Sequence, residues 1–99
     1  MAVDSTTLNS STLTTDPVAI GASGKATFVV KRGSTFGGAK VVVYQACANN
    51  AADYGKAGVI VENSDSNTCV VVGNEGEYVK AEIVNESSST SISLDIGTA

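Results

Sequence analysis

Residues 77–96 read EYVKAEIVNESSSTSISLDI, and this stretch determines the predicted fold. Apolar and polar residues alternate on both sides of a polar segment, which is the pattern of strands with one buried face. The intervening Asn, Glu, Ser and Thr residues, 85–90, favour a turn. The residues predicted to face inward are Val79, Ala81, Ile83, Ile92, Leu94 and Ile96.

The same kind of pattern fills the rest of the chain from residue 17 onward. Ala26, Phe28 and Val30 alternate with polar residues, and further short apolar runs are separated by clusters of Gly, Asn, Asp and Ser. This spacing predicts an all-β fold, a small antiparallel β-sandwich of about seven strands that is Ig-like or jelly-roll-like. The predicted strands span residues 18–22, 25–32, 39–47, 58–62, 68–72, 77–84 and 91–96.

Two runs, Val41–Val43 and Val70–Val72, are apolar on both strand faces. A two-layer sandwich needs only one apolar face per strand, so each run carries a surplus apolar face. That face is either covered by a loop or meets another chain, and the sequence leaves both alternatives open.

Residues 1–16 form a Ser/Thr-rich segment that we predict to be an extended N-terminal arm, followed by a β-sandwich domain over residues 17–99. The segment shows no repeating apolar face, so we expect contacts with other chains to order it, by strand addition to a neighbour's sheet. Its sizeable apolar residues, Val3, Leu8 and Leu13, are the candidate partner-binding residues. Removing this arm is then expected to leave the thermal midpoint of the domain nearly unchanged.

Composition excludes several classes of function. The chain of 99 residues has no His, a net charge of −4, and 14 Val against 3 Leu. Lack of His removes the commonest general base and metal ligand, and the acidic balance argues against nucleic acid as a partner. No apolar run reaches the roughly 20 residues that a membrane-spanning helix needs, so we expect no membrane partner.

Candidate cofactor and metal sites are weak. Residues 62–67 offer oxygen ligands but lack the central Gly and closing Glu of a calcium loop. The Gly-rich segment 33–38 lacks the Gly-Lys-Ser/Thr of a phosphate loop, so we expect Phe36 to fasten it to the end of the sandwich. We predict no catalytic residue, no cofactor and no metal, and expect Cys47 and Cys69 to be buried and reduced.

Three segments together resemble a known family. Residues 33–45 read GSTFGGAKVVVYQ, residues 76–84 read GEYVKAEIV and residues 90–96 read TSISLDI. This arrangement resembles small virion proteins of tailed bacteriophages, in which a G-x-F-G-G-A-x-V-x-V strand leads to a G-x-Y-V-(K/R)-A strand and a Ser/Thr-rich final hairpin. The resemblance covers residues 17–97 and implies a β-sandwich capsid decoration (cement) protein or a head or tail accessory protein, with no catalytic residues.

The expected function is therefore that of a non-enzymatic phage structural protein, a decoration protein that binds and stabilises the outer face of the head. Its expected partner is the major capsid protein, with repeated copies or a homo-oligomer on a symmetric shell, at the capsid surface after synthesis in the host cytoplasm. The alternatives are a tail, neck or fibre accessory protein and an Ig-like carbohydrate- or surface-binding module. The scarcity of aromatic residues argues against the last, since only Tyr44, Tyr54 and Tyr78 could form a sugar platform.

Overall fold

The computed structural model describes residues 2–21, 24–47, 50, 54–61, 67–72 and 77–98, with the backbone alone for Ala2 and for 67–72. These residues form eight strands and no helix. In chain order the strands are β1 (Ala2–Asn9), β2 (Val18–Ala19), β3 (Lys25–Val30), β4 (Lys40–Ala46), β5 (Gly55–Ile60), β6 (Asn67–Val72), β7 (Tyr78–Val84) and β8 (Ser91–Thr98).

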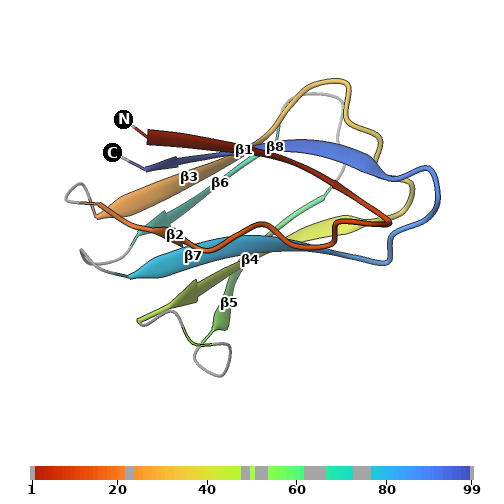
Figure 1. Ribbon diagram of the computed structural model, residues 1–99. Helices are drawn as coiled ribbons and strands as arrows, with labels where there is room; N and C mark the ends of the chain where they lie inside the picture. The colour runs from red at the N-terminus through yellow and green to blue at the C-terminus, as the bar shows by residue number, and fades with distance from the viewer. Residues whose placement is uncertain are drawn as a thin grey trace.

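The first four strands pair with the last four in reverse order. β1 pairs with β8, β2 with β7, β3 with β6 and β4 with β5, all antiparallel. Two further pairings, β3 with β8 and β4 with β7, join them into a first sheet, β1-β8-β3-β6, and a second sheet, β2-β7-β4-β5. The sheets face each other in Figure 1. This strand order is that of a jelly roll, so the predicted β-sandwich is confirmed in its jelly-roll-like form.

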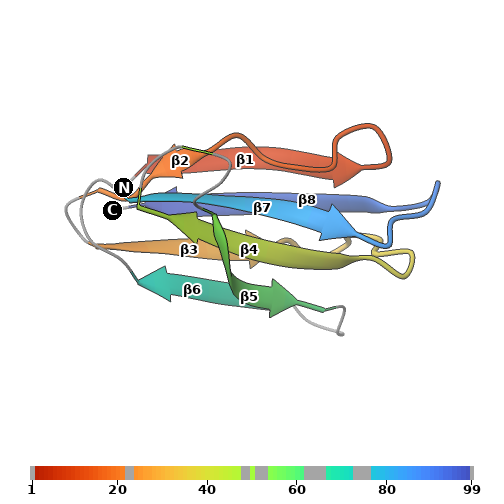
Figure 2. The same cartoon turned by 90° about the horizontal axis from the view of Figure 1, so that it is seen from below.

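The two edges of the sandwich carry different strands. β1 and β2 lie at one edge, here called the β1–β2 edge, and β5 and β6 lie at the opposite edge, as Figure 2 shows. The centre of each sheet consists of β8 and β3 in one layer and β7 and β4 in the other.

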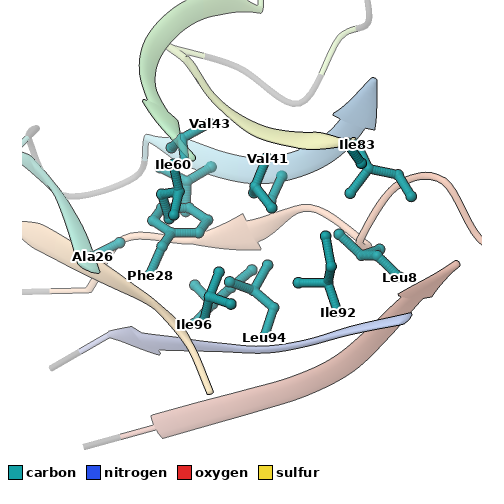
Figure 3. Packing of buried hydrophobic residues seen from close by; sticks show 14 of the residues in the cluster. Leu8, Ala26, Phe28, Val41, Val43, Ile60, Ile83, Ile92, Leu94 and Ile96 are labelled. Atoms are coloured by element: carbon teal, nitrogen blue, oxygen red, sulfur yellow. The ribbon is translucent and has the colours of Figure 1, made fainter. Parts of the chain in front are cut away.

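The predicted core faces are confirmed. The six residues predicted to face inward from 77–96, and the alternating apolar residues Ala26, Phe28 and Val30, are all at most 2% exposed. Their side chains meet between the sheets in Figure 3, where Val41 and Ile83 of the second sheet point toward Ile92 and Leu94 of the first. The same core cluster contains residues that the alternation had not singled out, namely Leu8, Ile20, Phe36, Ala39, Val41, Val43 and Ile60.

The N-terminal segment is part of the sandwich. Ala2–Asn9 forms β1 and pairs with β8 without a break in register, from Ala2 opposite Thr98 to Asn9 opposite Ser91. Leu8 is 0% exposed and lies in the core. This corrects the expectation that contacts with other chains order the segment. The hydrogen bonds come from β8 of the same chain, and Leu8 is buried in the core of the same chain.

The second half of this segment is also bound to the sandwich. After a tight turn between Asn9 and Thr12, the chain runs back along β7. The Ile83 amide donates a 2.8 Å hydrogen bond to the Leu13 carbonyl, and the Thr15 amide donates one of 2.9 Å to the Ala81 carbonyl. The stretch before β2 therefore lengthens the edge of the second sheet.

The Gly-rich loop after β3 packs as expected. Phe36 is 3% exposed, and its carbonyl accepts a 2.8 Å hydrogen bond from the Thr90 hydroxyl. Gly37 has φ +59°, and an added Cβ would lie 2.6 Å from the Ser87 hydroxyl oxygen. Glycine adopts this left-handed backbone without strain, and its lack of a Cβ permits the close approach that holds the loop against residues 87–90.

Two further expectations are settled for the described side chains. Val42, on the outer face of β4, is only 6% exposed, so the chain itself covers that surplus apolar position. The side chains of Val70–Val72 and of Cys69 lie outside the described residues. Cys47 is exposed and free at the end of β4, which corrects the prediction that it is buried.

Candidate functional site

All three tyrosines of the chain lie near one another at the second sheet. Tyr44 on β4 is directly opposite Lys80 on β7 and Lys56 on β5. Since Val43 and Val79 face the core, the alternation of side chains places Tyr44, Tyr78 and Lys80 on the outer face. Three segments distant in sequence thus supply one surface. We call it the tyrosine–lysine surface and define it by Lys40, Tyr44, Tyr54, Lys56, Tyr78 and Lys80.

Lys80 lies at the centre of the tyrosine–lysine surface. Its ammonium nitrogen is 4.4 Å from the centroid of the Tyr54 ring and 5.9 Å from that of the Tyr44 ring. Both distances are within the range of cation–π attraction, so the two rings hold the ammonium in place. Burial raises the pKa of the Tyr54 phenol, and the neighbouring Tyr78 phenol adds to the increase, so the Tyr54 ring stays neutral at physiological pH.

The charge of this surface opposes that of the whole chain. Lys40, Lys56 and Lys80 are three of only six basic residues in a chain whose net charge is −4. Among the described residues of this outer face, Glu82 is the one acidic residue; it lies opposite Val42. The surface is therefore a local region of positive charge on an acidic protein.

The predicted partner-binding residues differ in their exposure in the structure. Val3 and Leu13 are 58% and 42% exposed and both belong to the β1–β2 edge, so they remain candidates. Leu8 is fully buried in the core, which corrects its assignment as a partner-binding residue. Along β1 only alternate side chains can face inward, and Leu8 is the large apolar side chain on that inner side.

The β1 strand is an unprotected sheet edge. It is eight residues long, its register with β8 has no bulge, and it contains no Pro, Gly or Lys. By contrast β2 has two residues, while β5 contains Lys56 and a register shift opposite β4. The remaining edge strand, β6, also has a regular register and no Pro, Gly or Lys, but it is shorter than β1, with six residues. Short length, Lys and bulges are the devices that keep sheet edges from pairing with other chains. Since β1 has none of these three and only one charged residue, Asp4, its free edge can accept a further strand.

A small polar network lies beside β1 on the outer face of the first sheet. The Ser5 hydroxyl donates a 2.7 Å hydrogen bond to Asp95 Oδ1, and Lys31 Nζ lies 3.4 Å from Asp95 Oδ2. These residues border a depression of about 140 Å³ between β1, β8 and the end of β3. The Ser5 hydrogen bond, with a smaller contribution from the Lys31 charge, holds the pKa of Asp95 below its ordinary value, although partial burial opposes the shift.

We expect Ser5→Ala to raise the pKa of Asp95 toward its ordinary value, because the hydrogen bond to the carboxylate is lost. The lowered pKa in the folded state means that ionised Asp95 stabilises the fold above its unfolded-state pKa. This contribution disappears as the pH falls through the folded-state pKa. A carbon-13 NMR titration of the Asp95 carboxyl measures the shift, with Thr7→Ala as the control. An unchanged pKa in Ser5→Ala would contradict the assignment.

The residues that the structure describes do not gather the side chains of a metal centre. No group of three or more His, Cys, Asp or Glu side chains that could hold a metal ion occurs within them. In the same part of the chain, no helix has the length and apolar character to cross a membrane. The features that remain are two surfaces, the β1–β2 edge and the tyrosine–lysine surface.

Sequence reasoning had identified the tyrosines only as too few for a sugar platform. Alternation alone places Tyr44 on the outer face of its strand, and Tyr78 and Lys80 on that of theirs. The sequence does not show that these strands are neighbours, nor that Tyr54, which precedes β5, lies over Lys80. The pairing of β4 with both β5 and β7 brings them together.

Comparison with family models gives no match, and comparisons with curated proteins and with solved structures give none either. The relation to phage virion proteins therefore stays a hypothesis that rests on residues 33–45 and 76–96.

Proposed function

We propose that this chain is a non-enzymatic structural protein of a tailed-phage virion, which decorates the outer face of the head by binding the major capsid protein. A jelly-roll sandwich supports this role as a stable scaffold, since the architecture recurs in viral capsid domains. Because fold alone does not establish function, the proposal depends on a surface suited to attachment.

The β1–β2 edge is the observation that carries the proposal. It combines the unprotected strand β1 with the exposed apolar side chains of Val3 and Leu13. A strand of the capsid protein can add to β1, so that main-chain hydrogen bonds provide affinity and the two apolar side chains add buried area. This differs from the strand addition expected from the sequence, in which the segment would join a neighbour's sheet, because β1 already belongs to its own sheet and here accepts the partner's strand.

Many copies on a shell make modest affinity at one site sufficient if the protein is an oligomer that engages several capsid subunits at once. Attachment at a sheet edge leaves both outer faces of the sandwich free for neighbouring copies or for ligands. A tail, neck or fibre position is the alternative for the same edge, and the attachment assay distinguishes it by using heads and tails separately.

We expect the double variant Val3→Asp/Leu13→Asp to lose most of its binding to purified heads, because two charges would enter the contact. The matched control is Val61→Asp/Val59→Asp, whose side chains are 53% and 41% exposed, against 58% and 42% for Val3 and Leu13. Both double variants should keep the wild-type thermal midpoint, since all four side chains are exposed.

The measurement is the amount of protein that cosediments with heads assembled from the major capsid protein encoded by the same genome. Loss of binding in the first variant alone supports attachment through the β1–β2 edge. Full occupancy by the first variant would contradict it, and binding to tails but not to heads would move the protein to the alternative position.

A further inference from the structure

The tyrosine–lysine surface has a chemistry that attachment at the β1–β2 edge does not use. It occupies the outer face of the second sheet around β4, β5 and β7, whereas β1 belongs to the first sheet. In Figure 2, β4 and β5 lie toward the side opposite β1, while β7 lies between β2 and β4. A chain attached by β1 would therefore still present this surface to solvent.

The position of Lys80 suits recognition of an anion. An ammonium group carries three donors, and the π faces of Tyr54 and Tyr44 attract its charge without supplying a carboxylate partner. Among the described residues no ion pair of Lys80 is found, while Lys31 is paired with Asp95. A ligand carboxylate can thus bind an ammonium whose place is already fixed by two rings, which lowers the entropic cost of binding.

The neighbours of Lys80 extend the site across the sheet. Lys56 and Lys80 flank Tyr44 from the adjacent strands, and neighbouring strands are about 4.8 Å apart. Positive charge therefore lies on both sides of an aromatic ring. This arrangement fits a ligand that alternates acidic groups with flat apolar faces, rather than a single small anion.

We propose that the tyrosine–lysine surface binds an acidic polysaccharide, with sugar carboxylates paired to Lys80 and Lys56 and a sugar ring stacked on Tyr44. A pyranose ring presents its C–H bonds on one face and its polar groups at the rim, so it matches a half-buried tyrosine that is apolar in the middle and polar at its hydroxyl. This activity is additional to the proposed attachment and does not depend on it.

Two other polyanions fit the surface less well. Nucleic acid needs a strongly basic footprint, whereas this chain has a net charge of −4 and its one Arg, Arg32, lies in the loop that follows β3. An acidic protein interface would need a well-packed apolar centre. Here the apolar residues near the centre of the face are Val42, which is 6% exposed, and its β5 neighbour Val59, which is 41% exposed, and this pair offers less apolar area than such a centre needs.

The test is an NMR titration of nitrogen-15-labelled protein with hexagalacturonate, and with cellohexaose as the neutral sugar of equal length. We expect shifts confined to β4, β5, β7 and Tyr54 for the acidic sugar, weaker binding at higher salt, and much weaker binding of the neutral sugar. Lys80→Gln and Tyr44→Ser should each lower the affinity about tenfold or more, since each removes a direct contact.

The control variant is Lys31→Gln, which removes one positive charge from the outer face of the first sheet and should leave sugar affinity unchanged. Thermal midpoints show whether each variant is folded. If Lys80→Gln or Tyr44→Ser does not fold, Lys56→Gln takes its place in the titration. The proposal is overturned if hexagalacturonate does not bind, if Lys80→Gln binds it as tightly as wild type, or if hexaglutamate or a single-stranded DNA binds this surface more tightly than the sugar.

Discussion

We expect Phe28→Ala to lower the free energy of unfolding by about 3–5 kcal/mol, the largest effect of any single substitution in this chain. Phe28 is 0% exposed and is the largest fully buried side chain. It lies opposite Ile96 on β8, and its ring points between the sheets toward Val43 and Ile60 in Figure 3. Truncation would remove contacts to both layers and leave a cavity that a rigid sandwich cannot close.

The neighbouring residue provides the control. Val29 lies on the opposite face of the same strand and is half-buried, so Val29→Ala should cost less than about 1 kcal/mol. Chemical denaturation of the two variants and the wild type gives both values. A cost below about 1 kcal/mol for Phe28→Ala would mean that the strand faces are wrongly assigned.

The second large effect is expected at Leu8, where Leu8→Ala should cost about 2–5 kcal/mol. Its side chain is 0% exposed and reaches the core from the edge strand β1, near Ile92, its cross-strand neighbour on β8. Leu13→Ala is the matched control from the same segment. Because the Leu13 side chain is 42% exposed, this substitution should lower the free energy of unfolding by no more than about 0.5 kcal/mol.

This pair of variants tests whether the first sixteen residues belong to the fold. An independent arm would tolerate both substitutions equally, and its removal would leave the thermal midpoint unchanged. The pairing of β1 with β8 predicts the opposite: deletion of residues 1–9 uncovers the β8 edge and the core beneath Leu8, so the midpoint should fall sharply. If both substitutions lowered the free energy of unfolding by an equally small amount, the segment would be an independent arm and not part of the fold.

Much of this fold follows from local patterns. Ile92, Leu94 and Ile96 alternate with polar residues in a strand that is buried on one side, so their inward face can be predicted without knowledge of the neighbours. The same is true of Val79, Ala81 and Ile83, and each of the seven predicted strands overlaps an observed one. Alternation succeeds here because antiparallel sheets with one solvated face impose it directly on the sequence.

The strand that was missed shows the limit of this reasoning. β1 reads AVDSTTLN and needs only Leu8 to anchor it, because an edge strand contributes little core. One buried residue among the seven side chains described in β1 gives no periodicity, and the pairing of this strand with β8 joins opposite ends of the chain. Such a contact depends on the topology of the whole sandwich, which alternation within one segment does not specify.

The candidate surfaces were predictable to different degrees. Val3 and Leu13 stand out in a polar segment as apolar residues, and both are exposed at the β1–β2 edge. The tyrosine–lysine surface could not be predicted, because Tyr54 and Lys80 are brought within 4.4 Å only by the order of strands in the second sheet. Isolated apolar residues in a polar segment can be recognised in the sequence. A site built from several strands can be recognised only when the pairing of those strands is known.

Hydrogen–deuterium exchange on heads with bound protein tests most directly the claim that β1 is the attachment strand. In the free protein, the β1 amides that point away from β8 should exchange readily, since the outer edge of this strand is unpaired. The account predicts that peptides covering residues 2–9 exchange much more slowly on heads, while peptides from β4 and β7 keep the rates of the free protein. Unchanged exchange in residues 2–9 together with new protection of β4 and β7 would contradict it.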